Sequence, residues 1–211
     1  VVQALDTALE GALSALVESG DFTGAAGQTS VLYTAGKIPA RRVIVVGLGA
    51  ESDFTLESVR RAAAVAAKTV KGLNVARVAS LVHGLGTGAL TPAEAAFAVV
   101  EGSLLATYRF AATKQLPEPP HEIKTLTIME FDGDRLATIE AGSSQAQAIA
   151  AGVAIARLVH PQPRAKLHAR HRPVDVMQHH TTEQTVILWT KDVVSQRLTP
   201  DEASYRFAVA L

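Results

Sequence analysis

The sequence contains no cysteine, and it is poor in methionine and in aromatic residues. The absence of cysteine excludes disulfides, thiol nucleophiles and thiolate metal ligands, and it is compatible with the cytoplasmic location that we predict. Aromatic residues make up 5% of the 211 residues, whereas apolar residues as a whole make up 48%, many of them alanine. This composition is typical of a globular protein whose helices pack closely through small side chains.

Net charge is absent as well, because 20 lysines and arginines balance 20 aspartates and glutamates. This balance argues against a nucleic acid or an anionic membrane held by bulk charge. Apolar runs long enough to span a bilayer are also missing, and no signal peptide opens the chain. We therefore predict neither nucleic acid nor a membrane as a partner. Because the chain begins with valine rather than methionine, it could be a fragment whose first strand lies upstream.

The clearest predicted element is a long helix over Thr91–Lys114. Thr91 is a good N-cap, Pro92 occupies the first helical position, and Glu94 stands where a capping-box carboxylate reaches back. Glu101 falls among apolar side chains that recur at spacings of three and four, so that they share one helix face. Those apolar residues are Phe97, Val100, Leu104 and Tyr108. The pattern predicts a well-capped helix that packs on a sheet.

Strand and helix patterns alternate along the rest of the chain. The β-branched run Arg42–Val46 predicts a strand that is buried on both faces. The other predicted strands are Ser30–Thr34, Val75–Val82 and, nearer the sheet edge, Lys124–Phe131; the other predicted helices are Ala4–Ser19, Leu56–Leu73 and Glu140–Val159. This order predicts an α/β fold in which a mixed β-sheet is flanked by helices on both faces.

The character of the sequence changes after His160. Residues 164–172 are basic and rich in histidine, and hydrophobic periodicity beyond them is weak, although Val186–Trp189 could form a strand. We therefore divide the chain into a domain over residues 1–160 and a poorly defined, divergent tail over residues 161–211, which could be partly disordered.

Two glycine-rich turns are candidates for binding an anion. Gly47-Leu48-Gly49 follows the buried strand, as a Rossmann phosphate loop would, but Ser52 replaces the third glycine and the next helix begins late, near Thr55. The second turn, Gly84–Gly88, could hold an anion through backbone amides. An ordinary strand-exit turn and a flexible loop are the favoured interpretations of the two segments.

A group of histidines near the tail is the candidate for metal binding, because imidazole is a common ligand of zinc, nickel and copper. No pair of these histidines has the spacing of an H-E-x-x-H helix, and carboxylates near them are few. The histidines are His160, His168, His171, His179 and His180, and the carboxylates are Asp175 and Glu183. Surface histidines without a metal are the favoured interpretation.

Nucleophilic and carboxylate chemistry finds no clear candidate. None of the serines considered stands in G-x-S-x-G. They are Ser19, Ser30, Ser80, Ser103, Ser143 and Ser144. The carboxylate pairs Asp132/Asp134 and Asp201/Glu202 are explained by a turn and by a helix start. The residues themselves therefore nominate no catalytic, cofactor-binding or metal-binding group.

Several segments nevertheless resemble one family in its own order. Glu101–Phe110 is similar to the E-G-x-x-L-x-x-Y-x-F signature in the N-terminal domain of leucyl (cytosol) aminopeptidases. The other similar segments are Leu5–Leu13, Gly20–Gly24, Arg42–Gly49, Arg60–Ala63 and Gly152–Val159. The resemblance covers roughly residues 3–161, and it implies a macro-like α/β domain.

The resemblance also implies a function that this chain does not carry by itself. Full-length members of the family are hexameric peptidases that use two divalent metals, manganese or zinc, to release N-terminal amino acids. Such chemistry needs several carboxylates around paired ions, but the family's N-T-D-A-E-G-R-L segment is absent here, and the similarity ends at His160–Arg164. We therefore predict a non-catalytic assembly or regulatory domain, without cofactors and inactive alone, whose partners are a catalytic domain or sister subunits.

Two further alternatives stay open at this point. The chain could be a truncated or frameshifted product that diverges near His160, which we favour, or a stand-alone accessory domain with its own tail. Because the family's N-terminal domain is similar to macro domains, the alternative function is a module that binds a nucleotide or ADP-ribose at the glycine turns after Val46 and Val82.

Overall fold

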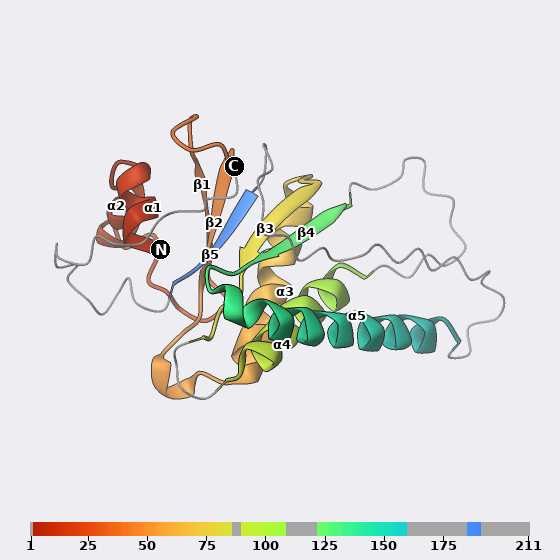
Figure 1. Cartoon of the computed structure of the whole chain (residues 1–211). Coiled ribbons are helices and arrows are strands. Elements are labelled where there is room, and N and C mark those ends of the chain that lie inside the picture. The colour runs from red at the N-terminus through yellow and green to blue at the C-terminus, as the bar shows by residue number, and fades with distance from the viewer. Residues whose placement is uncertain (1, 86–89, 109–121, 160–184, 191–211) are drawn as a thin grey trace, which may run out of the picture.

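The computed structural model describes residues 2–85, 90–108, 122–159 and 185–190. Five strands form one mixed sheet in the order β1-β2-β5-β3-β4 (Figure 1). The strands are β1 (Thr29–Tyr33), β2 (Arg42–Gly47), β3 (Arg77–Leu81), β4 (Thr125–Met129) and β5 (Thr185–Thr190). Strand β1 is antiparallel to β2, and the other neighbours are parallel, so the prediction of a mixed sheet is confirmed.

Strand β2 shows why helices cover both faces of the sheet. Successive side chains of a strand point to opposite faces. Val43 and Val45 pack in one buried cluster with the two N-terminal helices, whereas Ile44 and Val46 pack in another cluster with helix α3 (Leu56–Gly72). The prediction of a strand buried on both faces is confirmed, and so is the layered α/β arrangement (Figure 1).

The N-terminal region differs from its prediction. The single helix expected over Ala4–Ser19 is wrong, because the chain forms two short helices, α1 (Val2–Ala8) and α2 (Ala12–Glu18). Between them Glu10 and Gly11 adopt positive φ angles of 56° and 83°. The leucine spacing misled the prediction because leucines from both helices and from the turn between them meet in one cluster. They are Leu5, Leu9, Leu13 and Leu16.

Helices α3 (Leu56–Gly72) and α4 (Pro92–Thr107) begin as their capping residues predict. The hydroxyl of Thr55 accepts a hydrogen bond from the Ser58 amide, and the hydroxyl of Thr91 accepts one from the Glu94 amide. Helix α4 ends earlier than the predicted Lys114, because Tyr108 has ψ 133° and leaves the helical conformation. The rest of that predicted helix, residues 109–114, lies outside the described residues.

Two 3₁₀ turns complete the described secondary structure, η1 (Glu51–Asp53) and η2 (Gly133–Arg135). Helix α5 (Leu136–Val159) follows η2 directly and starts four residues before the predicted Glu140. It lies beside α4, which lies beside α3, so that the three long helices form one layer (Figure 1).

Strand β5 extends the predicted strand at Val186–Trp189 by one residue at each end. It occupies the middle of the sheet, parallel to β2 on one side and to β3 on the other. Residues 160–184 and 191–211 lie outside the described residues, and the division of the chain at residue 160 stays a prediction.

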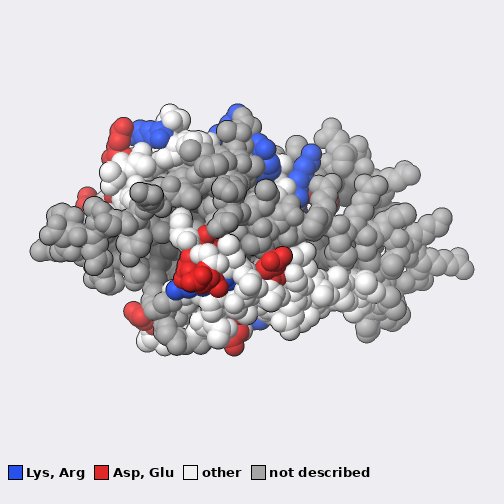
Figure 2. Space-filling model, in the orientation of Figure 1, with Lys and Arg blue, Asp and Glu red and all other residues white. Residues whose placement is uncertain are grey.

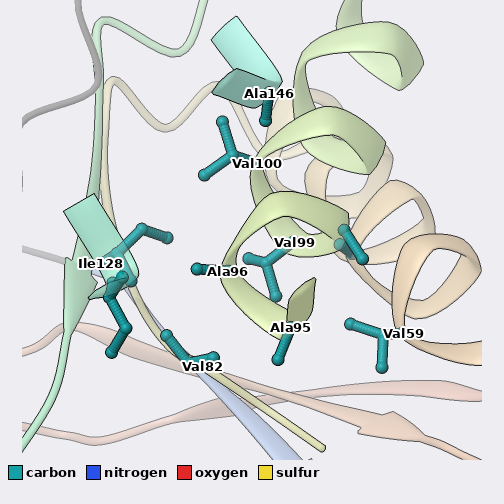
Figure 3. Close-up of a cluster of buried hydrophobic side chains, with 11 residues drawn as sticks. Val59, Val82, Ala95, Ala96, Val99, Val100, Ile128 and Ala146 are labelled. Carbon is teal, nitrogen blue, oxygen red and sulfur yellow. The ribbon is translucent and has the colours of Figure 1, made fainter. Parts of the chain in front are cut away.

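The largest buried cluster joins the three long helices to the sheet. Figure 3 shows Val59 of α3, Val99 of α4 and Ala146 of α5 around the same interior, with Val82 and Ile128 from the strand side. The helix residues are mostly alanine and valine, as the composition predicts. Helices can approach one another closely where the side chains between them are small.

Candidate functional site

The signature segment of α4 holds the three long helices together. Nε of Arg60 on α3 donates to Oε2 of Glu101 at 2.6 Å, and only 13% of the Glu101 side chain is exposed. This hydrogen bond, which outweighs the cost of burial, raises the pKa of Arg60. Gly102 permits the close approach of the two helices, because a Cβ atom at this position would lie 2.4 Å from the Arg60 carbonyl oxygen.

Helix α5 is attached to α4 in the same manner. A Cβ atom on Gly142 would lie 2.2 Å from the carbonyl oxygen of Ala93. The hydroxyl of Tyr108 donates to the carbonyl oxygen of Ala154 at 3.2 Å, and the guanidinium of Arg157 lies 5.7 Å from the Tyr108 ring centroid. Glu101, Gly102 and Tyr108, which belong to the signature, therefore position the three helices relative to one another.

The opposite face of α5 is apolar and exposed. Its buried face contains Ile139, Ala146, Ala150 and Ala154. Its exposed face towards the C-terminal end, which we call the α5 apolar surface, consists of Ala148, Ile149, Gly152, Ile155 and Ala156. Ile149 and Ile155 are 41% and 44% exposed. Much of the surface at the position of α5 is neither acidic nor basic (Figure 2).

The glycine turn after β2 is filled by the protein's own backbone. The Gly47 amide donates to the carbonyl oxygen of Gln28 at 2.8 Å, and the Gly49 amide donates to that of Gly24 at 3.0 Å. A Cβ atom on Gly47 would lie 2.1 Å from the carbonyl oxygen of Ala25. These contacts account for the two glycines without a bound phosphate. The next two elements, η1 and α3, also carry carboxylates in their first turns, Asp53 among them. Negative charge at these positions disfavours the binding of an anion there.

The turn after β3 is described only in part, because residues 86–89 lie outside the described residues. Its first residue, His83, is buried, and its Nε2 lies 3.0 Å from the carbonyl oxygen of Val59. Burial lowers the pKa of His83 to about 3, so the imidazole is neutral at neutral pH. Gly84 packs against Phe54 and Leu90, which makes this corner part of the core.

The serines have structural roles where their contacts are described. The hydroxyl of Ser103 donates to the Val99 carbonyl oxygen within α4 at 2.8 Å, and the hydroxyl of Ser19 donates to Leu16 at the end of α2. Ser80 lies in β3 and donates to the Leu81 carbonyl oxygen. Ser30 lies in β1, while Ser143 is buried and Ser144 exposed on α5.

Several carboxylates in the described residues act as caps or form ion pairs. As predicted, Asp132 serves a turn, because its Oδ1 accepts from the Asp134 amide and its Oδ2 pairs with Arg135. Sequence reasoning missed Asp6, whose Oδ1 accepts from the amides of Leu13 and Ser14 at 2.8 and 3.1 Å. Asp6 thereby satisfies the first amides of α2 from the preceding helix. The sequence signal that was available for this cap is a carboxylate, Asp6, followed by Gly11 and then by a new run of apolar residues.

The structure does not describe the candidate metal ligands in the tail. The five histidines, with Asp175, Glu183 and the pair Asp201/Glu202, lie outside the described residues. Within the described ranges, no group of three or more histidines and carboxylates could hold a metal ion. No helix in those same ranges is long and apolar enough to cross a membrane.

Comparison with known proteins agrees with the fold and with the signature. Residues 1–117 match the family described as "Cytosol aminopeptidase family, N-terminal domain". Since this match spans more than half of the chain, the chain belongs to the cytosol aminopeptidase family, and the matched part is the N-terminal domain of that family. The resemblance predicted from Glu101–Phe110 and the accompanying segments is confirmed.

Relatives and solved structures give the extent of the similarity. A probable cytosol aminopeptidase of Roseiflexus castenholzii is 38% identical over 72% of this chain and 30% of its own length. The cytosol aminopeptidase of Pseudomonas aeruginosa PAO1 is 34% identical over 74% and 31%, respectively. A tomato leucine aminopeptidase mutant has a TM-score of 0.60 at 26% identity, covering 74% of this chain and 30% of that chain. The chain thus spans about 30% of the length of the curated relatives.

Proposed function

We propose that this chain is a non-catalytic assembly or regulatory domain of a leucyl-aminopeptidase-like metallopeptidase. The match to the family's N-terminal domain supports the proposal, and so does the chain's share of its relatives, about 30% of their length. In the proposed role the domain associates with a catalytic domain or with sister subunits of a hexamer. The name that the relatives bear, cytosol aminopeptidase, supports a cytoplasmic location.

The α5 apolar surface is the observation that best supports association. A helix that is fixed in the core through Gly142 and Ala146 presents two isoleucines outwards, each more than 40% exposed. Exposed apolar residues that gather on one face mark interaction sites more often than scattered ones do. Covering Ile149 and Ile155 would remove apolar area from water at about 25 cal/mol per Å².

Peptide hydrolysis is proposed only for the whole protein. The two divalent metals, manganese or zinc, are implied by the family resemblance for full-length relatives. The described residues that define the signature are engaged in helix contacts, as Glu101 is with Arg60. We therefore expect the purified chain, supplied with either metal, to leave a leucyl chromogenic amide uncleaved. Metal-dependent turnover that follows the purified chain through chromatography would contradict a non-catalytic domain.

The association can be tested with the catalytic part of a relative. The full chain would be co-expressed with the C-terminal portion of the Roseiflexus castenholzii aminopeptidase, and the complex recovered by affinity chromatography. We expect Ile155→Glu to reduce recovery at least tenfold, because it places a charge in a desolvated surface. Thr138→Glu, an exposed change in the first turn of α5 and away from the α5 apolar surface, is the matched control and should leave recovery unchanged. Equal recovery of the Ile155→Glu and control variants would contradict the proposed surface.

A further inference from the structure

The central position of the sheet is filled by a strand from outside the matched domain. Strand β5 spans Thr185–Thr190, whereas the family match ends at residue 117. β5 is also separated from α5, which ends at Val159, by residues 160–184. The other four strands lie within residues 29–129, so β5 is the member of the described sheet that is most remote in sequence.

The two strands beside β5 are anchored independently of it. Ile44 and Val46 of β2 pack in one buried cluster with Val78 of β3, and helix α3 joins them through Ala66 and Val70. Strand β3 is paired with β4 on its other side, and β2 is paired with β1. Helix α3 therefore packs against both β2 and β3, and these contacts do not depend on which strand lies between the two.

The central position binds its strand through backbone hydrogen bonds on both sides. Strand β5 pairs with β2 in parallel register from Arg42↔Thr185 to Gly47↔Thr190. It pairs with β3 from Val78↔Thr185 to Ser80↔Ile187. Without an occupant, β2 and β3 would each present a row of unpaired amide and carbonyl groups, and such edges recruit an extended segment.

We propose that the position between β2 and β3 is an acceptor site for an extended peptide rich in β-branched and apolar residues, and that residues 185–190 occupy it as an intramolecular ligand. Main-chain hydrogen bonds to two strands supply affinity, and the parallel register fixes the direction of the peptide. A segment tethered in the same chain has an effective concentration on the order of millimolar. The chain's own β5 therefore outcompetes a free peptide of the same sequence.

A disulfide tests the register and the source of the occupant. Because the chain has no cysteine, Ile44→Cys combined with Ile187→Cys provides the only two thiols, on paired positions of β2 and β5. Neighbouring strands lie about 4.8 Å apart, which suits disulfide geometry. The matched control, Ile44→Cys with Val186→Cys, is offset by one residue from the backbone register, in which Val186 pairs with Val43. A one-residue offset between neighbouring strands separates two positions to opposite faces of a sheet.

We expect the paired variant to form a disulfide within one chain and the offset variant to form none. Equal crosslinking of both variants, or of neither, would overturn the proposal. A disulfide between two chains would overturn the intramolecular occupant and assign the strand to a second copy.

Peptide binding tests the acceptor site itself. The probe is a fluorescent peptide with the sequence of residues 185–190, Thr-Val-Ile-Leu-Trp-Thr, added to the full chain. Ile187→Pro removes a ladder hydrogen bond in the middle of β5 and should vacate the site, whereas Thr185→Pro stands at the first strand residue, where proline is tolerated. We expect the Ile187→Pro chain to bind the peptide at least about tenfold more tightly than the Thr185→Pro chain.

A folded Ile187→Pro chain that ignores the peptide would contradict an acceptor site. If Ile187→Pro prevents folding, the Ile44→Cys chain can be incubated under oxidising conditions with a peptide that carries cysteine in place of the isoleucine. The peptide is supplied well above the roughly millimolar effective concentration of the tethered β5, so that it can displace that strand. Trapping of that peptide, and not of one with cysteine in place of the preceding valine, supports the site; equal trapping of the two peptides, or of neither, contradicts it.

Discussion

The two sides of the sheet are built from different side chains. On one side, α1, α2 and the segments adjoining them contribute large buried residues, among them Leu5, Leu9 and Phe22. On the other side α3, α4 and α5 meet through alanines and through glycines such as Gly102 and Gly142. The first side depends on filled volume, whereas the second depends on room left for neighbouring backbones. Removing volume should therefore be most costly on the first side, and adding volume should be most costly on the second.

The largest effect is expected from removing volume beneath α1 and α2. Phe22 is 1% exposed and packs with Leu5 and Val43. Phe22→Ala should lower the free energy of unfolding by about 3–5 kcal/mol, because it leaves a cavity as well as losing apolar burial. Chemical denaturation of the two proteins would measure the difference. Tyr33→Ala, at an apolar ring that is 68% exposed, is the control, and a loss as large there would contradict the comparison.

Adding volume should be costly on the other side. Gly102→Ala places a Cβ atom 2.4 Å from the Arg60 carbonyl oxygen, so we expect a loss of about 1–3 kcal/mol. Gly152→Ala is the matched control on α5, where nothing lies within 4 Å. There the gain in helix propensity should stabilise the chain by about 0.8 kcal/mol. Thermal or urea unfolding should give changes of opposite sign, and changes of the same sign would show that Gly102 has no steric role.

The buried imidazole on this side predicts a dependence on pH. The pKa of His83 is lowered from 6.5 to about 3 by burial, so the unfolded chain binds the proton first as the pH falls. Stability from this group is complete above pH 6.5 and is lost towards pH 3. Between pH 6.5 and pH 5 the loss should be about 1.5 kcal/mol. Urea titrations at both pH values measure it, and the loss should disappear in His83→Asn; an unchanged slope in that variant would be inconsistent with His83 as the source.

The smallest effect on stability is expected at the α5 apolar surface. Ile155→Glu alters a side chain that is 44% exposed, so the free energy of unfolding should change by less than about 0.5 kcal/mol. Circular dichroism during urea unfolding checks this expectation. A loss comparable to that of Phe22→Ala would show that Ile155 serves the core rather than an interface.

The parts of the fold predicted correctly depend on residues that are close in sequence. Thr91 and Glu94 form the capping box that their spacing predicts, and Thr55 caps α3 through Ser58. The run predicts a doubly buried strand because each of its residues after Arg42, from Val43 to Val46, is apolar and β-branched. Each of these features involves side chains no more than a few positions apart, so the sequence contains the whole interaction.

The sequence motif of the candidate site was recognised from the sequence, but the contacts that its residues make between helices were not predicted. The signature that begins with Glu101 and Gly102 identified the family. Arg60, which both residues contact, lies 41 residues before Glu101. No periodicity rule connects two helices over such a distance. The exposure of Ile155 was equally hidden, since α5 is apolar on more than one side and only packing against α4 selects the buried side.

The sequence by itself determined the helix starts, the alternation of strands with helices and the membership of the family. Only the tertiary structure decided that Gly11 separates two helices, that Glu101 binds α3 and that residues 185–190 lie between β2 and β3. The physical reason is range. Capping and strand burial are encoded within a few residues, whereas ion pairs between helices and the order of strands depend on which distant segments the folded chain brings together.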